Sequence, residues 1–361
     1  MTYTTPDPAE ALRLLGEGTE RRKSQHIEIC LNEDVQGRNI TTGLERYRFV
    51  HNPLPELAFS AISTETSFLG RAMRAPLVVS SMTGGTKRAE RINRALAEAA
   101  QHRGWAMGVG SVRAAVENQQ LADTFRVREY APDIPIFSNV GAVQLNYGFG
   151  AEEARRAVDL VHADGLVLHL NSMQEVFQPE GDTDFSGLLR RIDRLCSVLE
   201  VPVGVKEVGW GIDGATALKL LGAGVRFIDA AGAGGTSWSQ VEKHRSGDPL
   251  RQAAAEAFAG WGIPTAESVR AVRAAVPQGT LIASGGLATG VDAAKSIALG
   301  ADLAGFGRQL LADADGPDAT ERLVRRFEQT ELELRIAMFG IGVSCLKDLR
   351  GTERLVAIAE R

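Results

Sequence analysis

Cysteine is scarce in this sequence: the chain has three, Cys30, Cys196 and Cys345, among 361 residues. They are odd in number, far apart and outside any C-x-x-C pattern, which argues against a disulfide framework and against a structural zinc site. This spacing is typical of a protein from a reducing compartment, and we expect a cytoplasmic location.

Long apolar runs and strong net charge are missing as well. No run approaches the roughly 18 apolar residues that a membrane span requires, and residues 1–7 lack the basic-then-apolar order of a signal peptide. A net charge of −5 argues against a general nucleic-acid surface, although a local basic patch for an anionic substrate is compatible with it. We therefore expect neither a membrane nor a nucleic acid as a partner.

Eight short apolar runs occur in order from residue 75 onward, and each ends in a polar or glycine-rich turn. They have the length of buried strands, which we place at residues 76–81, 105–110, 134–140, 165–168, 201–208, 225–231, 280–284 and 302–306. Segments with helical spacing separate most of them, at residues 87–101, 152–162, 188–199, 215–221, 265–276, 291–299 and 319–336. This alternation predicts an α/β fold, a (β/α)8 TIM barrel. A doubly wound open sheet is the alternative, but it normally has fewer repeats and a phosphate fingerprint after its first strand.

The first part of the chain carries no comparable rhythm. Residues 1–20 are polar and contain two prolines and two glycines, so we expect them to be poorly ordered and residues 21–361 to form a single domain. Residues 21–26, RRKSQH, are strongly basic, and a solvated surface is the plain interpretation of such a run. A short hairpin is expected within residues 58–69.

The carboxyl ends of the eight strands share one rim in such a barrel, and ligands bind there. The residues that follow the predicted strands are therefore expected to meet: Thr83, Ser111, Asn139, His169, Asn171, Lys206, Thr236, Gly285, Gly286 and Arg308. The sharpest change from apolar to polar residues comes after the fourth strand, where the apolar run is followed by HLNSMQE at residues 169–175. We interpret that segment as the chemical centre.

Two glycine-containing turns predict a phosphate site. Gly285-Gly286 follows the seventh strand and Gly307-Arg308 follows the eighth, the two loops from which barrels often build such a site. Glycines let backbone N–H groups approach phosphate oxygens, and Arg308 would add charge or only cap the rim. Two ordinary tight turns are the alternative.

Lys206 interrupts the valine-rich strand at residues 201–208. A lysine there must face a cavity or a partner, because burying an unpaired charge is costly. A Schiff base, a phosphate contact and an electrostatic effect on a flavin are the roles open to it. Thr83, Asn139 and Thr236 offer neutral hydrogen bonds that suit a polar heteroaromatic ring, so with the phosphate site they favour FMN over a sugar phosphate.

Three residues of the 169–175 segment are candidates for chemistry. Gln174 does not usefully transfer protons near neutral pH, so it would orient a substrate. Glu175 is a general base or a ligand of Mg²⁺, which a single carboxylate holds when substrate phosphates and waters supply the other positions. An exposed residue in the first turn of a helix is the alternative for Glu175. His169 by itself is more often a hydrogen-bonded core histidine than a catalyst.

Four motifs, taken in order, resemble those of a known family. They are Arg22-Lys23 with His26, SMTGG at residues 81–85, HLN with QE at residues 169–175, and GGTSW at residues 234–238. The ordered set covers nearly the whole chain and resembles the type 2 isopentenyl-diphosphate isomerases. Those are FMN-dependent (β/α)8 barrels that interconvert isopentenyl and dimethylallyl diphosphate, the precursors of isoprenoids.

The resemblance implies a role for each matching residue. FMN would be surrounded by Ser81, Met82, Thr83, Gly84, Ser111, Asn139, Lys206, Thr236, Gly285, Gly286, Gly307 and Arg308. The substrate would be held under an N-terminal segment that folds over the carboxyl rim, by Arg22, Lys23, Ser111, Arg113 and Gln174. The catalytic group would be Gln174, His169, Asn171 and Lys206, and Glu175 would bind Mg²⁺.

The resemblance also implies how the reaction proceeds. Proton addition and removal would occur at N5 of reduced FMN, with Lys206 stabilising negative charge near N1 and NAD(P)H as the reductant. The family forms homo-oligomers, so a homotetramer or homo-octamer is expected. Two positions depart from the family pattern: Ser24-Gln25 stand where acidic residues are frequent, and Val112 stands where glutamine is frequent.

Two other functions remain open. One is an FMN-dependent oxidoreductase of the 2-hydroxy-acid oxidase type on the same barrel, and the other is a non-catalytic flavin- or phosphate-binding sensor. The oxidase needs a histidine base and an arginine pair for a carboxylate, but the loop after the seventh strand reads ASGGL at residues 283–287, without such a histidine.

Overall fold

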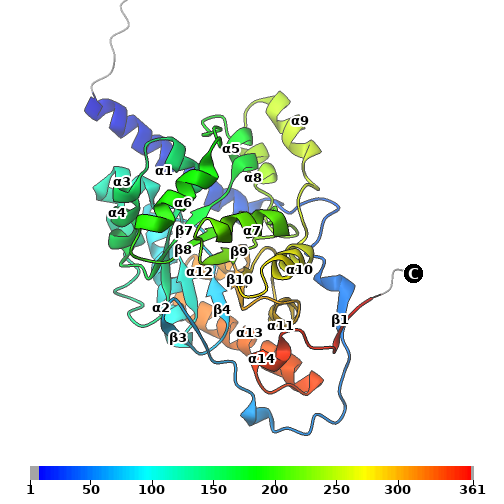
Figure 1. Ribbon diagram of the computed structural model, residues 1–361. Coiled ribbons are helices and arrows are strands. Elements are labelled where there is room, and N and C mark those ends of the chain that lie inside the picture. Colours follow the sequence, from blue (N-terminus) through cyan, green and yellow to red (C-terminus); the bar gives the residue numbers. More distant parts are fainter. Residues whose placement is uncertain (1–7, 359–361) are drawn as a thin grey trace, which may run out of the picture.

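Eight parallel strands close into a barrel in the computed structural model, which describes residues 8–358, without the side chains of residues 8–17 and 19 (Figure 1). The strands are β4 (Leu77–Val79), β5 (Ala106–Gly108), β6 (Ile136–Gly141), β7 (Gly165–His169), β8 (Val203–Lys206), β9 (Phe227–Asp229), β10 (Thr280–Ala283) and β11 (Leu303–Phe306). Pairing of β11 with β4 closes the circle. Each of the eight predicted strands is found, and the predicted (β/α)8 barrel is confirmed.

The predicted helices surround the barrel. They are α2 (Lys87–Arg103), α4 (Ala151–Val161), α6 (Leu188–Val198), α7 (Gly214–Gly222), α10 (Thr265–Ala275), α11 (Gly290–Ala298) and α13 (Ala319–Ile341). Helix α2 shows the local signals clearly: the Thr86 side chain accepts a hydrogen bond from the Ala89 N–H at its start, and Gly104 ends it at φ 71°. In residues 8–358 none of the helices is long and apolar enough to cross a membrane.

Shorter helices were not predicted. They are α3 (Arg113–Glu117), α5 (Ser172–Phe177), α8 (Trp238–Arg245), α9 (Pro249–Ala257), α12 (Leu311–Ala314), α14 (Leu346–Leu349) and the 3-10 turns η1 (Leu44–Arg46), η2 (Phe59–Ala61), η3 (Gln119–Phe125), η4 (Ala142–Asn146) and η5 (Arg308–Leu310). Helices α8 and α9 occupy the stretch between β9 and α10, where no helix was predicted. Short helices carry too few turns for a clear apolar periodicity.

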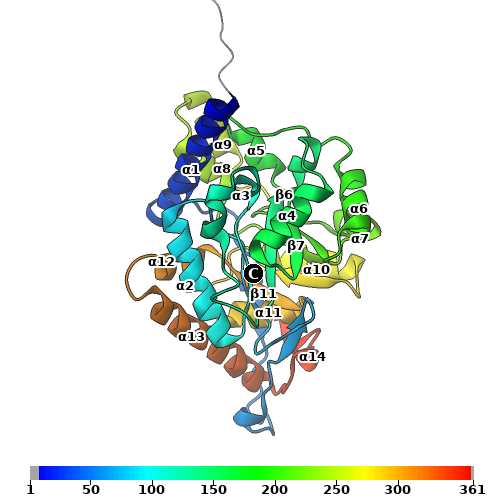
Figure 2. The ribbon, with the colours of Figure 1, turned by 90° about the vertical axis from the view of Figure 1, so that its left-hand side faces the viewer.

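Helix α1 (Pro8–Asn32) lies over the carboxyl-end mouth of the barrel, beside α8 (Figures 1 and 2). Ile27 on this helix is buried, and farther along the chain the Val35 carbonyl accepts the Ser237 N–H. The N-terminal segment thus folds over the rim, as expected. We expected residues 1–20 to be poorly ordered: residues 1–7 lie outside the described part of the chain, whereas residues 8–20 belong to a helix.

A hairpin closes the other end of the barrel. Strands β2 (Thr66–Phe68) and β3 (Arg71–Met73) pair antiparallel, starting inside the range expected for a hairpin. Phe68 and Met73 pack against the inward-facing strand residues Val78, Ala106, Phe137, Val167, Phe227, Ile282 and Leu303. Outside the barrel, β1 (Tyr47–Phe49) pairs with β12 (Leu355–Ala357) and joins two distant parts of the chain.

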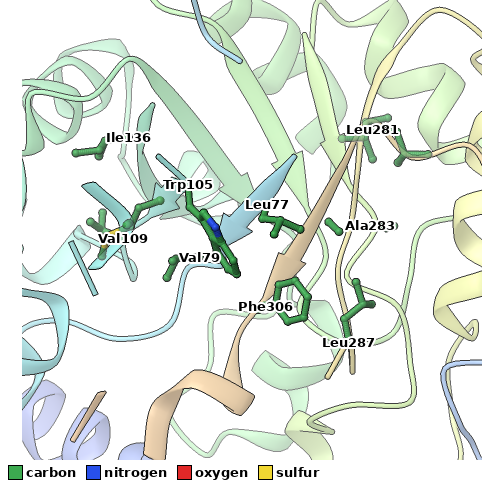
Figure 3. Close-up of a cluster of buried hydrophobic side chains, with 14 of the residues drawn as sticks. Leu77, Val79, Trp105, Val109, Ile136, Leu281, Ala283, Leu287 and Phe306 are labelled. Atoms are coloured by element: carbon green, nitrogen blue, oxygen red, sulfur yellow. The ribbon is translucent and has the colours of Figure 1, made fainter. Parts of the chain in front are cut away.

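The outward-facing residues of the same strands form a second, larger core with the helices (Figure 3). Leu77, Val79 and Phe306 belong to it, together with Trp105, whose ring stacks on Phe327 of α13 at a centroid distance of 3.8 Å. Both faces of each strand are therefore apolar, which explains why the strands appear in the sequence as continuous apolar runs.

Truncation of Phe68 to alanine is expected to lower the free energy of unfolding by about 3–5 kcal/mol. Its ring lies edge-on to those of Phe137 and Phe227, with centroids 6.2 and 5.0 Å away, so its removal leaves a cavity in the inner core. Chemical denaturation monitored by tryptophan fluorescence measures the loss. As a control, Leu54→Ala, at a residue that is 70% exposed, should change stability by less than about 0.5 kcal/mol. Equal effects of the two substitutions would contradict the conclusion that Phe68 of the hairpin packs into the inner core.

Candidate active site

The next inward-facing position of each strand, toward its carboxyl end, is polar or glycine. Side chains alternate with a period of two along a strand, so these positions, here called the floor positions, are Ser80, Gly108, Asn139, His169, Lys206, Asp229, Ser284 and Gly305. The pairing register places Lys206 of β8 between His169 of β7 and Asp229 of β9. The inner apolar core therefore ends at a polar surface.

A cavity of about 1480 Å³ opens above the floor positions. This is larger than the roughly 300–1,000 Å³ of a usual small-molecule pocket, so two ligands fit side by side. All the residues proposed from the sequence for a cofactor, substrate or metal line this cavity: Arg22, Lys23, Ser81, Met82, Thr83, Gly84, Ser111, Arg113, Asn139, His169, Asn171, Gln174, Glu175, Lys206, Thr236, Gly285, Gly286, Gly307 and Arg308. The structure thus brings the whole predicted set to one place.

The glycine turns after β10 and β11 suit a phosphate group. Gly285 and Gly286 have φ angles of 102° and 77°, which a residue with a side chain rarely adopts. After β11 the chain turns at Gly307 into η5 and α12, the kind of short extra helix that often completes phosphate sites in barrels. Nearby on the cavity wall, Ser81 Oγ is buried and lacks a hydrogen-bond partner in the protein, as a group that binds a ligand would. These features fit a bound FMN.

His169 is neutral in this environment. Burial, followed by the charges of Lys206 and Lys23, lowers its pKa to about 3. Its Nδ1 lies 2.7 Å from Asn139 Oδ1, which is an acceptor, so Nδ1 carries the proton and Nε2 keeps a lone pair. His169 therefore acts as a hydrogen-bond partner and not as a cationic acid.

Lys206 is buried beside two carboxyl groups. Its Nζ donates to the backbone carbonyl of Glu207 at 2.5 Å. The Glu207 carboxylate accepts three N–H groups of residues 208–210, yet burial outweighs these bonds and raises its pKa to about 7. Asp229 accepts a hydrogen bond from Ser284 Oγ at 2.5 Å, and burial raises its pKa as well. Lys206 is thus the one cationic side chain among the floor positions, beside the carboxyl group of Asp229.

Glu175 is buried at the start of α5, not exposed as the alternative interpretation required. Its carboxylate accepts hydrogen bonds from Asn171 Nδ2 and from the Asp182 N–H, each at 2.7 Å. Burial is the main effect on this carboxyl and raises its pKa. In residues 8–358 no three His, Cys, Asp or Glu side chains group around a common metal position. A Mg²⁺ ion on Glu175 would therefore depend on oxygens from substrate and water.

The basic run at residues 21–26 is not a solvated surface, because Arg22, Lys23 and His26 line the cavity. Lys23 Nζ donates to the Ser111 carbonyl at 3.0 Å and lies 5.0 Å from the centroid of the Phe125 ring. Burial, followed by the neighbouring Arg22 charge, lowers the pKa of Lys23 to about 7. An anionic ligand would reverse part of that shift.

Arg113, at the start of α3, is held by two carboxylates. It donates to Glu117 at 2.8 Å and to Asp182 at 2.9 Å. Asp182 also accepts from Gln144 Nε2 at 2.9 Å. A substrate anion that binds Arg113 would exchange these partners for its own oxygens.

Glu242 of α8 is a site residue that sequence reasoning missed. It is buried and accepts hydrogen bonds from His26 Nε2 at 3.0 Å, Gln174 Nε2 at 3.4 Å and Arg245 Nε at 2.7 Å. Burial by itself raises its pKa, but the bonds from His26 and Arg245 outweigh burial and lower it. Glu242 joins the N-terminal helix to Gln174, a contact between three distant segments that no local pattern predicts.

Asp229 was missed as well, although a signal for it exists. It breaks the apolar run at residues 225–231 in the same way that Lys206 breaks the run at residues 201–208. Arg226 also interrupts this run but is exposed and precedes β9, so only the carboxyl-terminal charge of the run marks a floor position.

Comparison with known proteins supports the flavin-type barrel. The sequence model of the FMN-dependent dehydrogenase family matches residues 18–128 and 153–356. Among solved structures, mandelate oxidase with (S)-2-phenylpropionate has a TM-score of 0.61 at 18% identity, over 94% of this chain and 97% of that chain. Mandelate oxidase with benzoyl-formic acid has a TM-score of 0.58 at 19% identity, over 88% of this chain and 87% of that chain. At such identities the structures show a common fold only.

Curated relatives are much more similar in sequence. Isopentenyl-diphosphate delta-isomerase of Oceanobacillus iheyensis is 52% identical over 339 residues, which cover 94% of this chain and 97% of the relative. The enzyme of that name from Nostoc sp. is 53% identical over 89% of this chain and 91% of the relative. The one from Rickettsia akari is 47% identical over 92% of this chain and 96% of the relative. The resemblance found in the motifs is confirmed: the chain belongs to the FMN-dependent dehydrogenase family of barrels and, within it, to the isopentenyl-diphosphate delta-isomerases.

Proposed function

We propose that the protein interconverts isopentenyl diphosphate and dimethylallyl diphosphate, with reduced FMN and Mg²⁺ as cofactors. The observation that supports this best is that one cavity is lined by two separate groups of residues suited to anions. The glycine turns after β10 and β11 suit the phosphate of FMN, and the cations Arg22, Lys23 and Arg113 suit a diphosphate. The relatives' name supplies the reaction.

Reduced FMN supplies the group that adds and removes the proton at the reacting carbon. The chain's own residues bind and orient the substrate. Gln174, linked to Glu242, positions the alkene, while His169 and Asn171 offer an acceptor and a donor near the diphosphate or the reacting end. Lys206 stabilises negative charge on the flavin. Binding energy at the remote diphosphate thus serves to position the double bond.

The protein also needs a metal ion and a reductant, and it forms an oligomer. Glu175 binds Mg²⁺, with substrate phosphate oxygens and waters as the remaining ligands. NAD(P)H serves as the reductant in the cytoplasm, and the protein forms a homotetramer or homo-octamer. Size-exclusion chromatography with light scattering tests the assembly, and flavin bleaching by NAD(P)H under nitrogen tests the reductant.

The function is tested with the purified, flavin-containing protein. After reduction by dithionite, it should convert isopentenyl diphosphate to dimethylallyl diphosphate with Mg²⁺, and the rate should fall when the flavin is reoxidised or Mg²⁺ is chelated. Consumption of a 2-hydroxy acid without isomerisation would instead indicate an oxidase. Retained FMN with no turnover would indicate a flavin-binding sensor.

The value of kcat/KM for isopentenyl diphosphate is expected to fall as pH rises through about 7, the pKa of Lys23. Below that pH the ammonium attracts the diphosphate, and above it the amine is neutral. Lys23→Met should lower kcat/KM by roughly tenfold or more and remove this part of the pH profile. The substrate's own titration appears equally in both proteins, so the difference between the profiles isolates Lys23.

The matched control for Lys23 is Lys87→Met, at an exposed lysine of α2 whose side chain is 78% accessible. It should leave kcat/KM and its pH profile unchanged. An identical pH profile in wild type and Lys23→Met would show that Lys23 does not titrate in the binding step.

A further inference from the structure

We propose that Asp229 is a positioning residue for the cofactor: it is a buried counter-charge beside Lys206 and sets how much of the lysine's positive charge acts on a bound flavin. The inference rests on the proposed binding of FMN over the floor positions and goes beyond the isomerisation, in which Asp229 takes no direct part.

The strand pattern places Asp229 next to Lys206 inside the barrel. Along β9, Phe227 packs in the inner core, Ile228 packs outward against the helices, and Asp229 therefore points inward again. Its register partner on β8 is Lys206, and paired strands lie about 4.8 Å apart. The carboxylate and the ammonium thus start from adjacent positions on the same face of the sheet.

Two donors hold the Asp229 carboxylate in place. Ser284 Oγ donates to Oδ1 at 2.5 Å and the Ala231 N–H donates to the same oxygen at 3.3 Å. Asp229 is only 4% exposed, and a charge at that depth requires a compensating charge nearby. Burial raises its pKa, and the positive charge of Lys206 acts in the opposite direction. Lys206, its register partner, is thus a cation whose charge favours the ionised form of this carboxyl.

The other polar side chains around Lys206, those of Glu207 and His169, form hydrogen bonds with other residues. Glu207 is tied to its own loop, since its Oε2 accepts the N–H groups of residues 208–210. His169, on the other side of Lys206, is uncharged and bonded to Asn139. Lys206 Nζ donates to the Glu207 carbonyl, which leaves the remaining ammonium protons for the cavity that Lys206 lines. Asp229 is therefore the carboxylate on the floor itself that moderates the field of Lys206.

This arrangement has a measurable consequence for a bound flavin. A positive charge close to the ring stabilises its reduced, negatively charged form, and a neighbouring negative charge weakens that effect. Asp229→Asn removes the negative charge and keeps an oxygen that accepts the two hydrogen bonds. At a fixed potential it should raise the ratio of reduced to oxidised FMN about tenfold, which for a two-electron couple is a positive shift of about 30 mV.

The experiment measures the midpoint potential of the holoenzyme without substrate. Wild type, Asp229→Asn, Lys206→Met and the double variant are saturated with FMN, with occupancy checked by flavin fluorescence, and equilibrated with a reference dye under anaerobic reduction. Asp229→Asn should shift the potential to more positive values. In the Lys206→Met background the same substitution should have little further effect, because without the Lys206 charge the buried Asp229 carboxyl is already neutral.

Further variants keep the test decisive. Asp164→Asn, at a carboxylate next to the amino end of β7 that pairs with Arg71 and Arg128, should leave the potential unchanged. If Asp229→Asn does not fold, Asp229→Ser serves instead, and it should shift the potential in the same, more positive direction because it also removes the carboxylate.

Two results would overturn the proposal: an unchanged potential in FMN-saturated Asp229→Asn, or an equal shift with and without Lys206. A protein that binds FMN but does not isomerise the diphosphate still gives these potentials, so the failure of the proposed reaction is distinguishable. A protein that binds no FMN would overturn both.

Discussion

Replacement of Lys206 by methionine is expected to lower kcat for isomerisation by roughly 10²–10³-fold. Methionine is nearly as long as lysine and can pack where the aliphatic part of the Lys206 side chain lies, but it lacks the ammonium group. Lys206 is the cation at the floor of the cavity, where burial strengthens electrostatic effects relative to water. The measurement is kcat of the reduced, FMN-saturated enzyme, together with the absorbance spectrum of the reduced flavin.

The control for this prediction is an exposed lysine on the neighbouring helix α7. Lys219→Met should leave both kcat and the spectrum as in wild type, because the side chain of Lys219 points to solvent. Wild-type turnover by Lys206→Met at full FMN occupancy would remove Lys206 from the catalytic group. A defect that disappeared on addition of excess FMN would show a role in cofactor binding only.

Substitution of Glu175 by glutamine is expected to raise the Mg²⁺ concentration for half-maximal rate at least about tenfold, since even the outer partners of metal ligands contribute 10–100-fold in affinity. Glutamine keeps a carbonyl oxygen that can accept the Asp182 N–H, so the local structure should persist. The higher Mg²⁺ requirement would then come from the missing negative charge. A Mg²⁺ titration of the initial rate at saturating substrate measures it.

The pKa of Glu175 provides a second test of the same assignment. Metal binding requires the deprotonated carboxylate, and burial raises this pKa, so the Mg²⁺ requirement of the wild type should increase as the solution becomes more acidic. Glu175→Gln should show a smaller increase, because only the protonation of the substrate's own phosphates remains. Glu152→Gln, at an exposed carboxylate of α4 that does not line the cavity, serves as the control and should leave the titration unchanged. Identical Mg²⁺ titrations for wild type and Glu175→Gln would contradict the assignment.

The positions of the site residues were predictable because a barrel imposes a simple rule. Once eight strands are recognised from apolar runs and turn residues, their carboxyl ends must share one rim. His169, Lys206 and Gly285 could therefore be assigned to one site although many residues separate them, and the cavity lining agrees. The motif resemblance then extended the assignment to Arg22 and Lys23, which precede the barrel in the chain.

Local sequence patterns did not predict contacts between segments that lie far apart in the chain. Glu242 lies on a helix of eight residues, and only the folded chain places it against both His26 and Gln174. The residues 21–26 have the composition of a solvated surface, and only the packing of α1 over the mouth brings three of them to the cavity. Helix α1 itself begins in a segment whose prolines and glycines suggested poor order.

The amino-acid sequence by itself determined the strands, most of the surrounding helices and the polar residues at each strand end, because these follow from short-range periodicity and turn chemistry. The tertiary structure decided which distant residues become neighbours: Phe68 of the hairpin against the inner core, Glu242 against Gln174, and Lys206 beside Asp229 in the register of β8 and β9. Such contacts join residues far apart in the chain, and a strand that is apolar on both faces does not reveal in its sequence which residues point inward.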